Sequence, residues 1–377
     1  MVDAGLLPLG VHHPLRRFWQ SARHFWRGQT ARLAWGLVAL LIVITVLQLL
    51  VQYRLNLWNR DFFNALEFRD GGEIWHQTHL LALFAAISIG LAVAAVWGRM
   101  TFQRSWRAWV SRHLIQTWLG DGRYRHIELG NGEHQNAEYR ITEDARLATD
   151  APIDLAVGLL ASVLTAGTFV VVLWHVGGAL GVTVLGLAFT IPGYLVVAAV
   201  AYAILTTGTL MVVGRHMIEV IESKNQSESE LKYAVAHLRE RATRRMSLTD
   251  VDGAASDVGA ALLDVIHQWR RLAWQYMRTT YVSHGNTLLA PLVGLILCVP
   301  HYVQGTMLLG DVTQAAAAFV AVQGAFNWLI DNFPRLAECL SSANRVGNLL
   351  LAFDALEPAE EPVASANTEK EQAANNA

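Results

Sequence analysis

Long apolar runs alternate with charged segments along the chain. We find six runs of about 20 residues, at 33–53, 80–98, 155–176, 180–205, 288–307 and 312–330. A run of this length is enough for a helix to cross a bilayer, and it is too long for a membrane β-strand. The fifth run is expected to be interrupted at Pro291 and Pro300, and the sixth contains Gln314, Gln323 and Asn327. The pattern predicts six transmembrane helices.

The connections between these runs are very uneven. Gly177 and Gly178 alone separate the third and fourth runs, and only a few residues separate the fifth and sixth. The connections at 99–154 and 206–285 are long and keep apolar residues at helical spacing, for example Trp106, Trp109 and Trp118. We therefore expect the spanning helices to continue well beyond the membrane and to fold back as long hairpins.

Composition supports a membrane protein. The 377 residues are 53% hydrophobic and 16% charged, with a mean hydropathy of +0.30, whereas a soluble domain has about 25% charged residues. The formal net charge of −2 gives no reason to expect nucleic-acid binding. Two cysteines, Cys298 and Cys339, are too few for a disulfide framework or a zinc site, and they are expected to be buried thiols.

The distribution of positive charge predicts the orientation. Lys and Arg are concentrated in the two long connections and are absent from the two tight turns. By the positive-inside rule, the long connections and both termini face the cytoplasm. We expect a cytoplasmic segment at 1–32, a six-helix domain at 33–353 and a disordered tail at 354–377 that is rich in Pro, Ala, Glu and Asn.

The turn after the first run is charged and aromatic. Residues 54–72 read RLNLWNRDFFNALEFRDGG, and the predicted orientation places them outside the membrane. Their aromatic rings suit the headgroup level, and their Arg residues are balanced by Asp and Glu.

Enzymatic motifs are missing from the sequence. The only lysines are Lys224, Lys232 and Lys370, and none stands in a G-x-x-x-x-G-K-[ST] loop. No HExxH motif or nucleophile elbow occurs. We therefore expect no catalytic residues, no metal and no cofactor.

Five segments resemble one family of transporters. NAEYRITEDARLATD (136–150) resembles the N-x-D-Q-R-I-x-x-D signature of SbmA/BacA-like transporters and of related bacterial and peroxisomal ABC transporters. ESELKYAVAHLRE (228–240) is similar to the EAA-like motif of this group, and IESKNQ (221–226) to the segment before it. LNLWNRDFFNAL (55–66) resembles the first external turn, and residues 311–346 resemble the last helix. Glu138, Tyr139 and Lys232 depart from the usual Asp, Gln and Arg.

The resemblance implies an all-α membrane fold, namely the transmembrane domain of a type IV ABC exporter with long cytoplasmic helix extensions. It also implies a homodimer in the bacterial inner membrane that imports peptides and peptide-like or bulky compounds, such as antimicrobial peptides and cobalamin. Transport would occur by alternating access driven by protons. In the family picture, the turn at 54–72 lines an external gate.

The resemblance and the charge pattern together give three sets of candidate site residues. The candidates for proton coupling are Glu219, Glu222, Asp331 and Glu338. The candidates for a coupling loop, which would contact an ATPase, are Asn136, Arg140, Glu143, Asp144, Glu230 and Lys232. The candidates for the external gate are Trp58, Arg60, Asp61 and Phe62.

Two alternatives stay open. The related ABC transporters continue into an ATPase domain, and this sequence ends where that domain would begin. The chain would then be the transmembrane subunit of an ABC transporter whose ATPase is a separate chain. The other alternative is a membrane scaffold or a truncated remnant that transports nothing.

Overall fold

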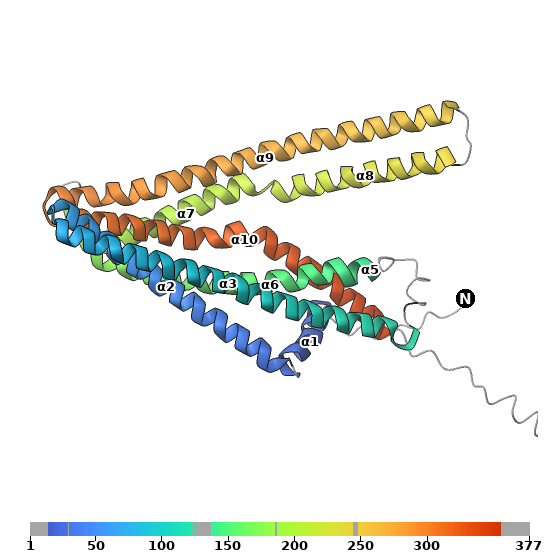
Figure 1. Cartoon of the computed structure of the whole chain (residues 1–377). Helices are drawn as coiled ribbons and strands as arrows, with labels where there is room; N and C mark the ends of the chain where they lie inside the picture. Colours follow the sequence, from blue (N-terminus) through green and yellow to red (C-terminus); the bar gives the residue numbers. More distant parts are fainter. Residues whose placement is uncertain are drawn as a thin grey trace, which may run out of the picture. The chain divides into compact units, whose positions relative to one another are not determined.

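The computed structural model describes residues 14–28, 30–122, 124, 137–184, 187–243 and 248–355. Nearly all of these residues are helical, which confirms the all-α fold class. The elements in chain order are α1 (Pro14–Arg27), α2 (Ala31–Glu67), α3 (Gly71–Leu119), a 3-10 turn (Gly120–Gly122), α5 (Ala137–Tyr139), a π-helical turn (Arg140–Asp144), α6 (Ala145–Gly177), β1 (Ala179–Val184), β2 (Leu187–Pro192), α7 (Tyr194–Gly214), α8 (Met217–Thr243), α9 (Leu248–Val303) and α10 (Leu309–Ala355) (Figure 1).

Five helical stretches of the described residues are long and apolar enough to cross a membrane. They are Ala31–Glu67, Gly71–Leu119, Ala137–Gly177, Tyr194–Glu240 and Ala255–Val303. The sixth expected span, at 312–330, lies in α10, which is not among these five. Gln314 and Gln323, which lower its hydropathy, are almost fully buried. Their amides therefore contact protein and would not be exposed to lipid.

The fourth predicted span was wrong at its start. Residues 180–192 were expected to be helical, but Ala179–Val184 and Leu187–Pro192 form an antiparallel β-hairpin, and α7 begins only at Tyr194. The hairpin lies between Gly178 and Gly193, which both have positive φ, and the Gly193 N–H donates to the Gly178 carbonyl (2.8 Å). Pro192 disfavours a helical conformation at Ile191, and the β-branched residues of this segment favour strands.

Two other expectations about the helices have clear outcomes. The long connections do contain helical extensions, because α3 continues to Leu119 and α8 and α9 lie side by side as a long antiparallel pair (Figure 1). The prolines of the fifth run, however, do not interrupt it: α9 is continuous through Pro291 and Pro300.

The chain forms two compact units. Unit 1 consists of Met1–Gln52, Leu81–Leu164 and Trp328–Ala377, and unit 2 consists of Tyr53–Leu80 and Thr165–Asn327. The expected division into 1–32, 33–353 and 354–377 separates a membrane domain from its terminal segments and does not concern compact units, so it stays a prediction. Residues 356–377 lie outside the described part of the chain.

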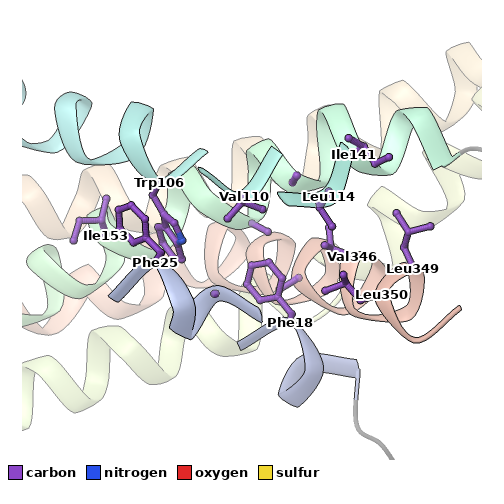
Figure 2. Close-up of a cluster of buried hydrophobic side chains, with 14 of the residues drawn as sticks. Phe18, Phe25, Trp106, Val110, Leu114, Ile141, Ile153, Val346, Leu349 and Leu350 are labelled. Atoms are coloured by element: carbon purple, nitrogen blue, oxygen red, sulfur yellow. The ribbon is translucent and has the colours of Figure 1, made fainter. Parts of the chain in front are cut away.

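The core of unit 1 joins α1, α2, α3, α6 and α10. Helix α1 is amphipathic, and it buries Phe18, Ala22 and Phe25 at i, i+4 and i+7. Figure 2 shows Phe18 and Phe25 among side chains from the other helices, including Trp106 of α3 and Val346 of α10. Arg17 also pairs with Asp354 at the end of α10, with Nε 2.6 Å from Oδ2.

The core of unit 2 joins α6, α7, α9 and α10. Its buried side chains include Phe169 and Leu173 of α6, Leu195 of α7 and Phe319 of α10. The thiol of Cys298 lies in this core, whereas Cys339 belongs to a small cluster in unit 1. Both cysteines are free and buried, as the sequence predicted.

Candidate coupling and gate sites

Asp144 is the structural centre of the first candidate site. It ends the π-helical turn Arg140–Asp144 and is only 1% exposed. Its two carboxylate oxygens accept hydrogen bonds from Arg345 of α10: Nε lies 3.0 Å from Oδ2 and Nη2 lies 2.7 Å from Oδ1. This bidentate pairing neutralises a buried carboxylate that would otherwise be costly.

Arg345 is held in place from several sides. Its guanidinium also donates to the hydroxyls of Ser341 and Ser342, both at 2.8 Å, and the Arg140 guanidinium donates to its backbone carbonyl (3.3 Å). The hydrogen bond to Asp144 raises the pKa of the Arg345 guanidinium above its ordinary value. The signature residues at 140–144 are therefore anchored to the last helix through one arginine.

A second ion pair repeats this arrangement further along the same two helices. Asp154 of α6 accepts a hydrogen bond from Arg335 of α10 (2.5 Å), and Arg99 lies 3.9 Å from the same carboxylate. Asp154 comes ten residues after Asp144, and Arg335 comes ten residues before Arg345. The two pairs therefore have the same antiparallel register and stand about 15 Å apart along α6.

Small side chains and an indole fill the space between and beyond these pairs. Ala151, Leu155 and Cys339 form a buried cluster against Trp328 and Leu336. One helical turn after Asp154, Gly158 lies directly against the Trp328 ring, where a Cβ atom would come within 2.6 Å of the ring. The contact between α6 and α10 in unit 1 thus depends on two ion pairs, on the small buried cluster and on the close packing of Gly158 against Trp328.

Three other charged residues of the signature segment, Glu143, Arg146 and Asp150, are partly exposed. Arg146 pairs with Glu143 (Nε to Oε2, 3.1 Å) and lies 3.6 Å from Asp150. The hydrogen bond from Arg146 lowers the pKa of the Glu143 carboxyl. Glu143 is thus partly exposed and paired at the surface, whereas Arg140 is half-buried with its guanidinium on the Arg345 carbonyl and Asp144 is fully buried. Asn136 lies outside the described residues.

The candidates on α8 are exposed. Glu230 accepts a hydrogen bond from Gln226 (2.8 Å), and Lys232 is exposed on the same helix. Glu219 and Glu222 are also exposed, and Glu219 lines a cavity of about 320 Å³ whose other charged lining residues are Arg271 and Arg278. Asp331 and Glu338 are exposed on α10 in unit 1, so the four proton-coupling candidates are divided between the two units.

The candidate gate residues lie at the end of α2 in unit 2. The Trp58 indole stacks on Phe62, with ring centroids 5.0 Å apart, and donates to the carbonyl of Gln77 in α3 (2.7 Å). Arg60 and Asp61 pair with each other at 2.9 Å and are half-buried. Here the gate candidates pack within the hairpin formed by α2 and α3.

The same hairpin caps the start of α10. Glu67 accepts a hydrogen bond from the Leu309 N–H and Asn64 accepts one from the Gly310 N–H, both at 2.8 Å. These are N–H groups of the first helical turn, which have no partner within the helix. A Cβ atom on Gly310 would come within 2.0 Å of the Arg60 carbonyl oxygen. Only glycine therefore allows so close an approach.

A buried pair of amides strengthens this connection. Asn56 donates to the Gln314 carbonyl (3.1 Å), and the Gln314 side chain donates back to Asn56 Oδ1 (3.2 Å). Sequence reasoning missed Asn56, Asn64 and Glu67 as contacts, although all three are part of the quoted turn. It also missed Arg345. The sequence does offer one signal for Arg345: it is a single Arg in a segment of α10 made mostly of small and apolar residues.

Comparisons with known proteins show which family the chain belongs to. The family described as ABC transporter transmembrane region 2 matches residues 27–244, which is more than half of the chain. The chain belongs to this family. The expectation of an ABC-type transmembrane domain is thereby confirmed, whereas the assignment to the SbmA/BacA-like branch stays a prediction.

Several relatives of this ABC transmembrane chain are longer proteins. It is 25% identical to the inner membrane ABC transporter ATP-binding protein YddA of Escherichia coli (strain K12), over 90% of this chain and 61% of the relative. It is 22% identical to an uncharacterized ABC transporter ATP-binding protein of Haemophilus influenzae, over 84% and 54%. It is 18% identical to the chloroplastic ABC transporter D family member 2 of Arabidopsis thaliana, over 88% and 45%. The chain thus spans about half to three fifths of the length of these relatives.

Proposed function

We propose that this chain is the membrane component of a homodimeric transporter in the bacterial inner membrane. Its cargo would be peptides and other bulky, peptide-like compounds, such as antimicrobial peptides and cobalamin, and the direction would be import. The family match over residues 27–244 carries the transporter assignment. The name of the Escherichia coli relative supports the inner membrane, and the resemblance of five segments to SbmA/BacA-like transporters supports the cargo.

The proposed mechanism is alternating access. Two six-helix halves would expose a shared cavity to one side of the membrane and then to the other, because substrate and the driving ion or nucleotide bind the two states with different affinity. In this scheme the α2–α3 hairpin, capped onto α10 through Asn64 and Glu67, acts as the external gate.

Two energy sources are each supported by an observation. Proton coupling is supported by the SbmA/BacA-like resemblance, and its candidates Glu219, Glu222, Asp331 and Glu338 are carboxylates exposed on the protein surface. ATP coupling follows from the names of two bacterial relatives, which are ATP-binding proteins. In that case the partly or fully exposed Glu143, Glu230 and Lys232 would form the surface that contacts a separate ATPase chain, with Arg140 beside them.

The deciding experiment is uptake of a fluorescent proline-rich peptide into cells that express this chain alone. The cells would be measured with and without a protonophore while cellular ATP is kept constant. Uptake that the protonophore abolishes would support proton coupling, and the Glu219→Gln and Glu222→Gln variants would then be expected to lose it. A matched control is Glu240→Gln, which removes a carboxylate of α8 that is not a coupling candidate.

The ATP-coupled alternative predicts a different result. The chain alone would give no uptake under either condition, and co-expression with a cognate ATPase subunit would restore it. Absence of uptake with every cargo and every partner would contradict transport altogether and would support the scaffold interpretation.

A further inference from the structure

Helix α3 carries one stripe of side chains that changes from apolar to basic along its length. The residues of the stripe recur at intervals of three and four, so they share one face of the helix. The members in and next to the predicted second span are apolar and strongly exposed: Val93 (65%), Trp97 (60%) and Met100 (64%). The members that follow are polar: Arg104, Arg107 and Ser111.

The polar half of the stripe lines an open cavity of about 410 Å³ in unit 1. Its other lining residues include Gln103 of α3 and Asp150 of α6. The Gln103 amide donates to the Asp150 backbone carbonyl (2.7 Å), so a hydrogen bond connects the two helices at the cavity. The cavity therefore has walls that are held together by the protein itself.

The cavity has an excess of positive charge. Arg104 and Arg107 are exposed, and neither forms an ion pair with another residue of the described part of the chain. The carboxylates of Glu143 and Asp150 lie 2.5 Å and 3.6 Å from Arg146, and Arg107 attracts them only from a longer distance. Three arginines thus face two carboxylates, and one positive charge in this group is not balanced.

The cavity lies where α3 leaves the predicted membrane. Trp97 is the last exposed ring of the apolar run, and an indole suits the headgroup level of a bilayer. Arg104 comes seven residues later, about 10 Å further along the helix. Side chains on a helix lean toward its N-terminus, which here is the membrane side, and a long Arg side chain can reach back to the interface. A headgroup beside Trp97 is therefore accessible to the arginines.

A phospholipid with a net negative charge matches both halves of the stripe. Guanidinium groups bind phosphate oxygens through paired hydrogen bonds, and the Ser111 hydroxyl is a further donor. Acyl chains that cover Val93 and Met100 remove apolar surface from water. On the predicted orientation, this is the cytoplasmic leaflet, where anionic lipids attract Arg next to a span. A soluble anion would match only the polar half.

We propose that the cavity between α3 and α6 binds the headgroup of an anionic phospholipid, whose phosphate lies on Arg104 and Arg107. Its acyl chains then follow Val93, Trp97 and Met100 along α3. The inference needs only that the chain spans a membrane, and it does not depend on the cargo or the energy source proposed above.

The first test compares two lipids that differ only in the headgroup. The purified chain in a nonionic detergent is titrated with dioctanoyl phosphatidylglycerol, which is anionic, or with dioctanoyl phosphatidylcholine, which is zwitterionic. We expect the wild type to bind the anionic lipid about tenfold more tightly at low salt, because each arginine near the headgroup adds to the attraction. High salt should reduce this preference. Equal affinity for the two lipids at low salt would overturn the proposal.

The second test removes the two guanidinium groups. Arg104→Gln and Arg107→Gln should each lower the preference for the anionic lipid, and the double variant should lose it while still binding the zwitterionic lipid. Arg112→Gln is the matched control, because Arg112 is an exposed arginine of the same helix that does not line the cavity. It should keep the preference of the wild type. An equal loss in Arg112→Gln would mean that the overall charge of the helix attracts the lipid, and the site would be disproved.

The remaining measurements separate a lipid from other occupants. Met100→Ser should weaken the binding of both lipids equally, and unchanged affinity would contradict the path of the acyl chains. Inorganic phosphate that displaced the anionic lipid at an equal concentration would replace the lipid by a soluble anion. If the double variant kept its lipid preference but no longer formed a dimer, the cavity would belong to an interface with a second copy of the chain.

Discussion

The pairing of Asp144 with Arg345 is the contact on which the signature segment depends most. Asp144 is fully covered, whereas the side chain of Arg345 is 41% exposed. Loss of the arginine would leave a buried carboxylate without a counter-charge. Loss of a more exposed charge elsewhere in the segment would leave no buried charge without its partner. The two kinds of ion pair in this segment should therefore respond very differently to mutation.

Arg345→Met is expected to destabilise the chain by about 3 kcal/mol, in line with the removal of one partner from a buried pair. Arg146→Met is the control, because its pair with Glu143 is at the surface, where water and salt screen the attraction, and should contribute little to stability. The measurement is the thermal unfolding midpoint of each purified variant in the same detergent. Equal losses of stability in the two variants would contradict the claim that burial of Asp144 makes its ion pair the more costly one to break.

His113 makes the stability of unit 1 depend on pH. It stacks on Trp109, with ring centroids 5.3 Å apart, and lies beyond the predicted second span. Burial, together with the nearby His24 and Arg17, lowers the pKa of its imidazole below the ordinary value of 6.5. As pH falls below about 6.5, the unfolded chain binds a proton that the folded chain does not bind, so stability decreases.

His113→Phe keeps an aromatic ring at this position and removes the titration. We expect the variant to lose less stability than the wild type when the pH is lowered from 7.5 to 5.5. Unfolding midpoints at several pH values would measure the difference. Parallel pH profiles for the two proteins would show that protonation of His113 has no influence on folding.

At the scale of elements, two ion pairs and the side chains packed beside them set the register between α6 and α10. The pairs Asp144–Arg345 and Asp154–Arg335 are both satisfied by one antiparallel alignment. Gly158 then brings the helix backbone directly against Trp328. A shift of either helix would separate both ion pairs and create a clash, so the contact has one preferred arrangement.

Gly158→Ala tests this packing. The added methyl group would meet the Trp328 ring at 2.6 Å, and we expect a loss of about 1–3 kcal/mol from overpacking. Gly167→Ala is the control on the same helix, where a Cβ atom meets nothing within 4 Å. That change should be neutral or should stabilise the helix by up to about 1 kcal/mol. Equal effects of the two substitutions on the thermal midpoint would be inconsistent with the contact.

The sequence predicted the elements better than it predicted their contacts. Hydropathy and helical spacing were enough for the long helices, because a span needs about 20 apolar residues whatever its neighbours are. The β-hairpin at 179–192 was missed, since an apolar run does not distinguish a strand from a helix. The partnership of Asp144 with Arg345 could not be read from a pattern, because the two residues are 201 positions apart. Such pairings depend on how the helices pack.

At the scale of the whole molecule, the predicted orientation can be tested with engineered thiols. The two native cysteines give a low background: both are buried, and burial raises the pKa of the Cys339 thiol to about 11. A water-soluble maleimide reacts with the thiolate, so the wild-type chain should label slowly. Phe68 follows α2 and is 66% exposed, and Tyr233 on α8 is 72% exposed. The two residues are a matched pair of exposed aromatic positions on opposite predicted sides of the membrane.

The prediction is that a membrane-impermeant maleimide labels Phe68→Cys in spheroplasts with intact inner membranes, whereas Tyr233→Cys is labelled only after the membranes are opened. This outcome follows if the positive charges of the long connections hold them in the cytoplasm. Equal labelling of the two variants after opening is the control for intrinsic reactivity. The reverse pattern in intact spheroplasts would invert the orientation, and it would move the α2–α3 hairpin, with its caps on α10, to the cytoplasmic side. The hairpin could then no longer serve as an external gate, and the exposed charges of α8 could not contact a cytoplasmic ATPase.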